Sequence, residues 1–445
     1  MKEVQLAIIG GGPAGLSCAY FLALQGYKPT VFEKNPHPGG MLRYGIPSFK
    51  LEKDVIDAEI EILKELGVEI RCGVEVGKEV TLADLRADGY KAFYLAIGCQ
   101  GGRKAGVPGE EAAGIQTAVN LLRTVGDDEN YKMSGRTVVI GGGNVAIDAA
   151  RVSLRCGADA VTMVCLEPRD GMPASAEEIA EAEEEGTAIR CGYGPKEFVT
   201  ENGHVTAVVL KKCTGLYNPE GRFAPTYDEN DTITLPCDNV VLSIGQCIEW
   251  GDLLDGEAVE LGRGQGAVAD PVTYQTAQPD VFVGGDVYTG PRFAIDAIAA
   301  GKQGAVSIHR FVQPGSTLTI GRNQRRYTAL DRDDVVIESY DNASREVARV
   351  DREREKAAPF SEYVETFTEE QVRAETARCL GCGASIVDPN KCIGCGLCTT
   401  KCAFDAIHLD RDRPECSTMV KYEQKLPSLG TYALKRAIKI KFGRK

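Results

Sequence analysis

Four cysteines in the C-terminal part of the chain have a spacing suited to an iron–sulfur cluster. They are Cys392, Cys395, Cys398 and Cys402, in a C-x2-C-x2-C-x3-C run. Thiolates spaced in this way wrap a [4Fe–4S] cubane, and small residues between them let backbone N–H groups turn toward the sulfides. A zinc site, which is the alternative, uses paired C-x2-C units instead. The run therefore predicts at least one [4Fe–4S] cluster, a group that carries one electron at a time.

Three further cysteines nearby, Cys379, Cys382 and Cys416, raise the question of a second cluster. Two cubanes need eight ligands, whereas this region holds seven cysteines. A second cluster would therefore need another ligand, such as His408, a carboxylate or a group from a partner protein. Two alternatives stay open for these three cysteines: a second cluster, or a small structural knuckle with free thiols.

The other end of the chain carries a dinucleotide fingerprint. Gly10-x-Gly12-x-x-Gly15 follows an apolar run at residues 4–9 and precedes an apolar-periodic segment. The first glycine permits the turn, the second lets the backbone approach a pyrophosphate, and the third lets helix and strand pack closely. The helix N-terminus then faces the phosphates. Glu33, at the end of the next strand, can accept hydrogen bonds from ribose hydroxyls, so the sequence predicts a nucleotide site.

The same unit recurs about 130 residues later, as an internal βαβ repeat at 136–167. Its turn is Gly141-x-Gly143-x-x-Ala146, with the alanine that the fingerprint allows at its third position. This second unit is expected to bind a nicotinamide nucleotide whose hydride passes to a flavin. The alternative is an empty, degenerate nucleotide-binding domain.

A third signature indicates which dinucleotide the first unit binds. The segment 280–301 reads as an apolar strand that ends in Gly284-Gly285-Asp286, followed by a helix. This pattern resembles flavoproteins of the two-dinucleotide class. In that class the aspartate binds the ribityl chain of FAD, and the next helix presents N–H groups to the flavin ring. The segment 96–100 is expected to be the strand that closes the FAD domain.

Several longer stretches resemble the small (β) subunit of bacterial glutamate synthase and its relatives. Those relatives include the flavin half of dihydropyrimidine dehydrogenase and the large subunit of NADH-dependent ferredoxin:NADP oxidoreductase. The stretches are "GGMLRYGIPSFKL" at 39–51, "VVIGGGNVAIDAAR" at 138–151, "MPASAEEIAEAEEEG" at 172–186 and "IGQ" at 244–246. The resemblance implies FAD in the first domain, a nicotinamide nucleotide in the second, and electrons that leave through iron–sulfur clusters to a separate catalytic subunit. Family members usually carry their cluster cysteines ahead of the FAD domain, whereas here they follow it.

The fingerprints and the resemblance together give the candidate binding residues. Those expected to contact FAD are Gly10, Gly12, Ala14, Gly15, Glu33, Lys34, Gly40, Leu42, Arg43, Val76, Gly98, Gly285, Asp286, Arg292, Phe293 and Ala294. Those expected to contact the nicotinamide nucleotide are Gly141, Gly143, Asn144, Val145, Ala146, Glu167, Arg169 and Gly245. No catalytic side chain is expected, because the flavin carries out hydride transfer.

The expected fold class is α/β: a two-dinucleotide-binding Rossmann flavoprotein of the glutathione-reductase type, followed by a small α+β ferredoxin-like domain. The expected boundaries are 1–129 and 246–315 for the FAD-binding domain, 130–245 for the NAD(P)H-binding domain, 316–365 for a connector, 366–420 for the ferredoxin-like domain and 421–445 for a basic tail.

Composition narrows the class of protein further. The 445 residues are 43% hydrophobic with a net charge of −13, which disfavours binding to nucleic acid or to an anionic membrane. No apolar run is long enough to span a bilayer. Sixteen cysteines, seven of them between 379 and 416, favour metal ligation in a reducing compartment, so the cytoplasm is the expected location. The other nine cysteines form no C-x-x-C pair, which disfavours a disulfide reductase, and Cys99 is expected to be a packing residue.

The leading functional interpretation is an oxidoreductase subunit that takes electrons from NADH through FAD and a [4Fe–4S] cluster to a partner enzyme or to ferredoxin. NADH is preferred over NADPH because Leu166 and Glu167 stand where relatives carry arginines for the 2′-phosphate. The alternatives are a non-catalytic electron-relay or scaffold subunit of a larger redox complex, or a glutamate synthase small subunit proper.

Overall fold

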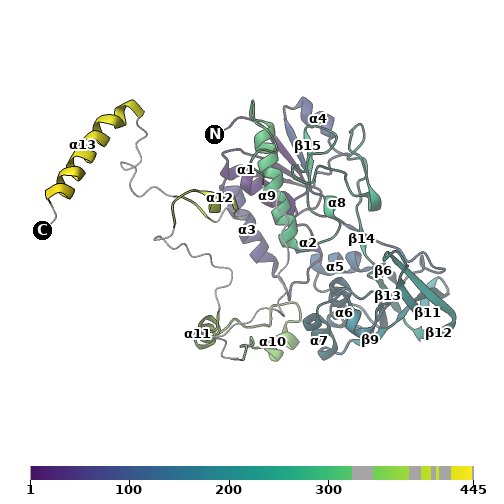
Figure 1. Cartoon of the computed structure of the whole chain (residues 1–445). Helices are drawn as coiled ribbons and strands as arrows, with labels where there is room; N and C mark the ends of the chain where they lie inside the picture. Colours follow the sequence, from purple (N-terminus) through teal and green to yellow (C-terminus); the bar gives the residue numbers. More distant parts are fainter. Residues whose placement is uncertain (1, 323–343, 380–391, 402–406, 410–421, 443–445) are drawn as a thin grey trace. The chain divides into compact units, whose positions relative to one another are not determined.

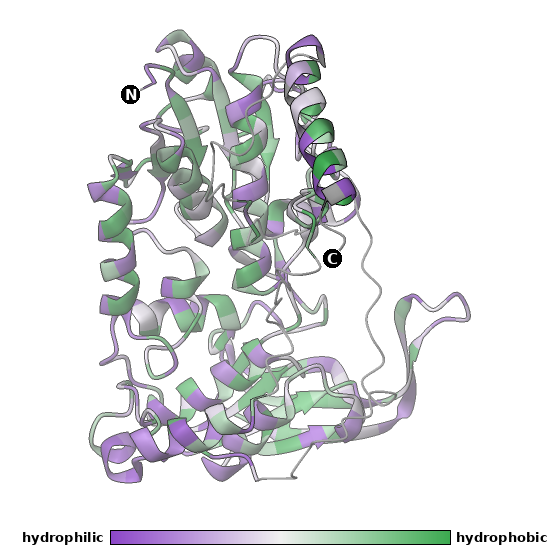
Figure 2. Cartoon of the chain, turned by 60° about the vertical axis from the view of Figure 1, so that its left-hand side comes forward, coloured by the Kyte–Doolittle hydropathy of each residue, from purple (hydrophilic) through white to green (hydrophobic). Residues whose placement is uncertain are grey.

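The computed structural model describes residues 2–322, 344–379, 392–401, 407–409 and 422–442. The chain divides into two compact units, residues 1–378 and 379–445. The first unit holds two parallel sheets, each with its own helices (Figure 1). In Figure 2 the strands inside the molecule are mainly hydrophobic in colour, as expected for parallel strands that are covered on both faces.

The first sheet has five parallel strands drawn from distant parts of the sequence. In spatial order they are β15 (Val281–Val283), β4 (Ala92–Leu95), β1 (Leu6–Ile9), β2 (Thr30–Glu33) and β3 (Glu69–Cys72). The strand expected at 96–100 thus lies directly before that segment, as β4, and 96–100 forms the loop after it. Because β15 pairs with β4, the Gly-Gly-Asp turn and the Gly10 turn emerge at the same edge of the sheet.

Two long helices cover one face of this sheet, α1 (Pro13–Leu24) and α9 (Ala294–Phe311). They cross closely at Gly301, where a Cβ would lie 2.3 Å from the carbonyl oxygen of Ala14. Other helices lie around the sheet: α2 (Met41–Tyr44), α3 (Lys53–Glu65), α4 (Leu82–Ala87) and α8 (Asp286–Thr289). The strand pair β5 (Gly101–Gly102) and β14 (Gln246–Cys247) and a short 3-10 turn at Arg263–Gln265 complete this domain. A second core on the opposite face includes Phe93, Leu95 and Leu253.

The second sheet repeats the architecture. Its order is β6 (Ile115–Thr117), β13 (Asn239–Leu242), β7 (Arg136–Ile140), β8 (Ala160–Cys165) and β9 (Ala188–Cys191). One face is covered by α5 (Ala118–Asp127), α6 (Asn144–Arg155) and α7 (Ala176–Glu184), and a 3-10 turn at Arg169–Gly171 precedes α7. The other face is covered by an antiparallel sheet of β10 (Tyr193–Glu201), β11 (His204–Tyr217) and β12 (Phe223–Pro236).

The second domain begins earlier in the sequence than the expected boundary at residue 130. β6 pairs in register with β13, and the buried side chains of α5, including Leu121 and Val125, belong to the same core as α6. An amphipathic helix is assigned by the surface it covers, which periodicity alone does not reveal. The structure therefore places 115–127 with the second domain.

The described part of the expected connector packs against the second domain. It contains α10 (Arg352–Ala357) and a bridge between Val350 and Val364. Phe360 and Tyr363 are buried in the core of the second domain. The helix that follows, α11 (Glu369–Ala377), also belongs to the first unit, although it lies within the range 366–420 expected for the ferredoxin-like domain.

The second unit contains α12 (Leu397–Lys401) and α13 (Tyr422–Phe442). The apolar side chains of α13 include Leu434, Ile438 and Ile440, all exposed, and its C-terminal half carries Lys439 and Lys441. None of the described helices, α13 included, combines the length and the apolar content needed to span a lipid bilayer.

Candidate functional site

The two glycine turns predicted from the repeat have the same geometry. Gly10 has φ +108°, and a Cβ there would lie 2.4 Å from the carbonyl oxygen of Ala96, just after β4. Gly141 has φ +148°, and a Cβ there would lie 2.2 Å from the carbonyl oxygen of Ser243, just after β13. Both positions lie in the region that disfavours side chains. The repeat is therefore confirmed as two equivalent strand–turn–helix units.

The helices after these turns begin without side-chain caps. Gly12 and Gly143 are the N-cap residues of α1 and α6, and neither helix receives a hydrogen bond from a capping side chain. No heavy atom outside its own turn lies within 4 Å of a Cβ built on Gly143. Free N–H groups at an uncapped helix start attract anions. Both helix starts therefore fit the phosphates of a dinucleotide.

A cavity opens at the carboxyl edge of the first sheet, and almost all of the residues predicted to contact FAD line it. The predicted residues that line it are Gly10, Gly12, Ala14, Glu33, Lys34, Gly40, Leu42, Val76, Gly98, Gly285, Asp286, Arg292, Phe293 and Ala294. The two others, Gly15 and Arg43, are not among its lining residues but contact neighbouring backbone. A Cβ on Gly15 would lie 2.0 Å from the carbonyl oxygen of Gly10, and Arg43 donates to the carbonyl oxygen of Pro38.

The Gly-Asp turn borders this cavity. Gly285 has φ +70°, and Asp286 accepts a hydrogen bond at 3.3 Å from the backbone N–H of Arg292. Burial raises the pKa of Asp286, and the hydrogen bond from Arg292 only partly offsets this effect. Helix α9, which follows the short α8, has Phe293 as its N-cap residue and no side-chain cap. Its first N–H groups are therefore available beside the aspartate, which is the arrangement that the sequence predicts for a flavin.

Glu33 already has protein partners. Its Oε2 accepts from the Gly11 backbone N–H at 2.7 Å, and its Oε1 accepts from the backbone and side-chain nitrogens of Asn35. Oε2 keeps a lone pair for a ribose hydroxyl. Arg123 of α5 in turn donates to Asn35. The contact between Glu33 and a ribose hydroxyl therefore stays a prediction. Sequence reasoning missed Asn35, which bonds to Glu33, and Arg123, which bonds to Asn35.

Sequence reasoning also missed part of the cavity wall. Gln246, Glu249, Trp250 and Leu253 line it. The signal was present, because Gln246 ends the "IGQ" stretch, the other three residues follow it closely, and Trp250 is the only tryptophan of the chain. From the second domain, the start of α6 reaches the same cavity through Val145 and Asp148. Both dinucleotide-binding domains therefore contribute residues to the lining of this cavity.

Around the second fingerprint, most predicted residues lie at the turn or beside it. Ala146 is fully buried, and Asn144 accepts from the Ser175 backbone N–H at 3.0 Å. A Cβ on Gly142 would lie 2.9 Å from Glu167 Oε2, so this carboxylate lies over the second glycine turn as Glu33 lies over the first.

Two other residues predicted for this site have protein partners of their own. The Arg169 guanidinium donates to Glu183 of α7 at 2.5 Å. Gly245 accepts through its carbonyl from Arg103. Both residues are therefore held by neighbouring side chains or backbone at the edge of the second dinucleotide-binding domain.

The cysteines of the first unit do not form a pair at the flavin cavity. Cys99 is buried, its thiol lies 3.8 Å from the carbonyl oxygen of Asp286, and burial raises its pKa to about 12. The thiols of Cys165 and Cys191 lie 3.7 Å apart at the ends of β8 and β9, and neither lines the cavity. Burial raises the pKa of Cys165 to about 12 as well. Thiols of such high pKa are poor nucleophiles at neutral pH.

In the second unit the described cysteines lie where the spacing predicts a tight turn. Cys392 and Cys395 are exposed, and Cys398 lies on α12. Gly394 and Gly396 between them have φ +66° and +76°, which only glycine adopts without strain. Cys379 is also exposed. Cys382, Cys402 and Cys416 lie outside the described residues, so the second cluster stays a prediction.

Two family models match the chain. The pyridine nucleotide-disulphide oxidoreductase model matches residues 4–301, and the 4Fe–4S binding domain model matches residues 385–408. The second match contains the whole Cys392–Cys402 run.

The curated relatives belong to the family that the sequence resembles. The chain is 38% identical over 388 residues to NADP(+)-dependent formate dehydrogenase subunit beta of Moorella thermoacetica, which covers 85% of this chain and 54% of that protein. It thus spans about half the length of that relative. It is 35% identical to the glutamate synthase [NADPH] small chain of Escherichia coli strain K12, over 69% of each chain. It is 34% identical to NAD-dependent dihydropyrimidine dehydrogenase subunit PreT of the same strain, over 69% of this chain and 68% of that one.

Solved structures show the same fold. FprA from Mycobacterium tuberculosis in complex with NADPH matches with a TM-score of 0.59 at 20% identity, over 70% of this chain and 85% of that one. Thioredoxin reductase from Lactococcus lactis matches with a TM-score of 0.55 at 21% identity, over 70% and 99%. The two-dinucleotide-binding fold is thereby confirmed.

The family model covers most of the chain, and the glutamate synthase relative is matched over more than two thirds of its length. We conclude that the chain belongs to the pyridine nucleotide-disulphide oxidoreductase family, as an oxidoreductase with FAD- and NAD(P)-binding domains and a 4Fe–4S binding domain.

Proposed function

We propose that this chain is an electron-input subunit. It takes electrons from a nicotinamide nucleotide, NADH in preference to NADPH, and delivers them through FAD and its [4Fe–4S] cluster to a partner subunit or to ferredoxin. The observation that carries the proposal is that residues of both dinucleotide-binding domains line one cavity. Val145, one residue after the start of α6, lines the same cavity as Gly12 and Asp286. A nucleotide bound at that helix start is thus next to the flavin site.

The residues of the chain have a binding and orienting role in this proposal. The uncapped starts of α1 and α6 would hold the two pyrophosphates, Asp286 would hold the ribityl chain, and the N–H groups at the start of α9 would serve the flavin. FAD, when bound, accepts two electrons as hydride and can release them singly, which suits it to join a nicotinamide to an iron–sulfur cluster. Trp250 and Leu253 add apolar side chains to the wall of this site.

The preference for NADH is supported by the end of β8. Glu167 lies over the second glycine turn, where a carboxylate suits a ribose 2′-hydroxyl and repels a 2′-phosphate. Arg169 is the basic side chain of the stretch that could offset this repulsion, and it is paired with Glu183. The names of the relatives include both NAD- and NADP-dependent proteins, so the preference rests on these residues.

A separate acceptor protein is supported by the relatives and by the exposed cysteine loop. Two of the relatives are named as subunits of larger dehydrogenases. Cys392 and Cys395 are exposed, which suits a cluster that exchanges electrons with another protein. The terminal substrate would then be set by the partner.

The first test uses the full chain purified without oxygen. We expect one FAD and at least about four iron atoms per chain, as one cubane requires, and reduction of an artificial dye by NADH. A chain that binds FAD but oxidises neither NADH nor NADPH would favour the non-catalytic relay subunit instead. Co-purification from native cells would then separate a fixed partner subunit from free ferredoxin.

A further inference from the structure

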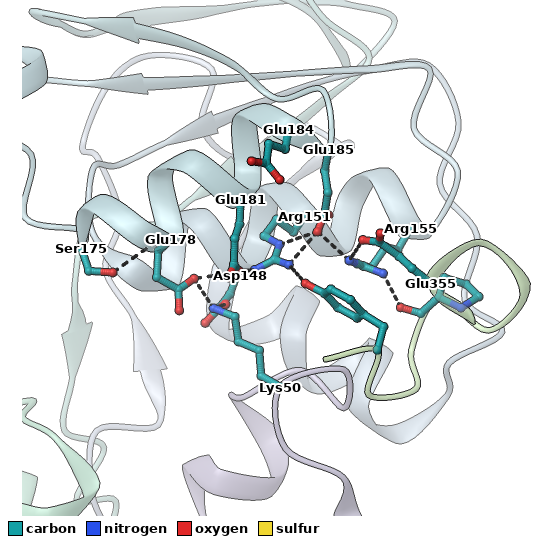
Figure 3. Close-up of polar contacts among 12 residues, drawn as sticks. Lys50, Asp148, Arg151, Arg155, Ser175, Glu178, Glu181, Glu184, Glu185 and Glu355 are labelled. Carbon is teal, nitrogen blue, oxygen red and sulfur yellow. Dashed lines mark hydrogen bonds and ion pairs between the residues drawn. The ribbon is translucent and has the colours of Figure 1, made fainter. Parts of the chain in front are cut away.

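Helix α6 carries three charged residues that follow its nucleotide-binding start. These are Asp148, Arg151 and Arg155, spaced three and four residues apart and therefore on one face of the helix. Figure 3 shows these residues among α7, the loop that contains Lys50 and the segment that contains Glu355. The side chain of Arg151 is fully buried, and that of Arg155 is 5% exposed. Buried charges of this kind need partners.

The first partner comes from the FAD domain. Lys50 lies in the loop between α2 and α3, and its ammonium lies 2.5 Å from Asp148 of α6 and also contacts Glu178 of α7. Residues on both sides of this contact line the flavin cavity, Ile46 from the loop and Asp148 from α6. Burial raises the pKa of Asp148, and the Lys50 ammonium opposes this rise. Lys50 therefore ties the wall of the cavity to the nucleotide-binding domain.

Phe49, the residue before Lys50, makes the same connection through packing. It belongs to the FAD-domain loop but is 2% exposed within the core of the second domain. The guanidinium carbons of Arg155 and Arg151 lie 4.1 and 4.9 Å from the centre of its ring. A desolvated cation–π pair of this kind is a favourable and directional contact.

The third partner is the segment 351–363, which leads toward the cysteine-rich region. The Tyr363 hydroxyl accepts from Arg151, and Arg155 donates to the carbonyl oxygen of Pro359 and to Glu355. Glu185 of α7 joins the two arginines, since it accepts from both at 2.6 Å. The contacts are contiguous from the cavity to this segment, because Arg151 also lies 3.8 Å from Glu178, a partner of Lys50.

From this network we infer that Phe49 and Lys50 are positioning residues that hold α6 against the flavin cavity. Residues 351–363 contact the same face of α6. We call these three parts, the loop with Phe49 and Lys50, helix α6 and residues 351–363, the joint. The nucleotide-binding start and the charged face belong to one rigid helix, so both are oriented together. Residues 351–363, here called the tether because they lead toward the iron–sulfur region, are thereby coupled to the orientation of the nicotinamide domain. Such coupling is reciprocal. A nucleotide that orders the start of α6 favours the contacts of α6 with residues 351–363, and those contacts favour nucleotide binding.

The joint is tested with two variants and matched controls. Lys50→Met removes the contact from the FAD domain, and Glu355→Gln/Tyr363→Phe removes two polar contacts of the tether without opening a cavity. The controls are Lys64→Met, which breaks an exposed ion pair with Glu61, and Glu353→Gln, which breaks an exposed pair with Lys356 on the same helix α10. The readouts are FAD content, kcat and KM for NAD(P)H with a dye that accepts electrons from the flavin, and hydrogen exchange.

For Lys50→Met we expect normal FAD content and a fall in kcat of about tenfold or more, because small misplacements of reacting groups are costly. For the tether variant we expect faster exchange in 351–363 and also in 45–52, although neither altered residue contacts Lys50. Nucleotide binding to the wild type should slow exchange in 351–363.

Two outcomes would overturn the inference. One is a Lys50→Met protein with full FAD and unchanged kcat. The other is a tether variant in which exchange rises only within 351–363, which would mean that this segment merely packs on the surface. The inference uses the proposed function only for the kinetic readout. A wild type that oxidises no nicotinamide nucleotide would defeat that function, while the exchange data would still decide the joint.

Discussion

The backbones of Gly12 and Gly40 pass so closely that a Cβ on Gly40 would lie 2.7 Å from the Cα of Gly12. Gly40 also has φ +54°. Both glycines line the flavin cavity, Gly12 at the start of α1 and Gly40 at the start of α2. The cavity floor at this point is therefore backbone, which lets a pyrophosphate approach the N–H groups directly.

We expect Gly40→Ala to lose most of its bound FAD while the chain still folds. The added methyl group would clash with the Gly12 backbone, and φ +54° disfavours alanine, so the α2 turn would move away from Gly12 and distort the floor of the cavity. Flavin absorbance per chain after gel filtration measures this. The matched control is Gly73→Ala, because Gly73 has φ +73° but open space around its Cβ. Full flavin content in Gly40→Ala would show that this close approach is not needed for binding.

Nucleotide preference is expected to follow Glu167 and Arg169. If repulsion of the 2′-phosphate is worth about 2 kcal/mol, kcat/KM should favour NADH by about thirtyfold. Leu166→Arg/Glu167→Arg should reverse this preference. Glu183→Gln, which releases Arg169 from its ion pair, should raise kcat/KM for NADPH severalfold and leave NADH unchanged.

The matched control for that variant is Glu177→Gln, an exposed residue of the same helix α7. The comparison needs kcat/KM for both nucleotides with one dye. A wild type that prefers NADPH would contradict the assignment.

The order of electron flow can be tested at Cys395. In Cys395→Ser we expect NADH to reduce a dye through the flavin at nearly the wild-type rate, while the iron–sulfur absorbance is lost. In the wild type, NADH should also bleach that absorbance. Cys72→Ser is the control, since Cys72 is exposed and distant in sequence from the cluster run. If Cys395→Ser keeps its FAD but loses dye reduction by NADH together with the iron–sulfur absorbance, the cluster must precede the flavin in the order of electron flow.

Cys99 is expected to be a packing residue despite its place beside the flavin cavity. Because burial raises its pKa to about 12, the thiol stays protonated at neutral pH and should react slowly with an alkylating reagent. Cys99→Ala should keep its FAD and its NADH-to-dye activity within about twofold, since a small buried thiol mainly fills space. Mass spectrometry of labelled protein should find Cys72, which is exposed, modified before Cys99. Loss of turnover in Cys99→Ala with full flavin would point to a redox role.

Lys53 is expected to give the folded state a specific pH dependence. Its ammonium donates to the carbonyl oxygen of Ile46 at 2.5 Å, and burial is the main cause that lowers its pKa from 10.5 to about 8. Between these two values the unfolded chain holds the proton and the folded chain does not. The contribution of Lys53 to stability therefore rises with pH across this window.

The measurement compares urea unfolding of wild type and Lys53→Met, followed by flavin fluorescence, from pH 7.5 to pH 10. Relative to this variant, the wild type should gain stability as the pH rises. Lys64→Met, on the exposed side of α3, should show no such trend relative to wild type. A constant difference between wild type and Lys53→Met would show that Lys53 keeps its ordinary pKa.

The sequence by itself determined the features whose physics is local. A glycine turn between an apolar strand and a helix needs only a few adjacent residues, so Gly10 and Gly141 were both recognisable. The same holds for the cysteine run, where ligand spacing is a property of a short loop. The positive φ angles of Gly394 and Gly396 agree with the turn that this spacing requires.

Tertiary structure alone decided the features that depend on contacts between distant segments. Nothing in the periodicity of α5 indicates which sheet it covers, because an amphipathic helix fits any apolar face of suitable size. Likewise, Arg169 reads as a free cation in the sequence, and only the position of Glu183 on α7 gives it a partner. Lys50 and Tyr363 lie more than 300 residues apart, yet both bind the charged face of α6 or its α7 neighbour. Local sequence carries no record of such pairings, since they form only when the chain folds and charges that leave water must find partners.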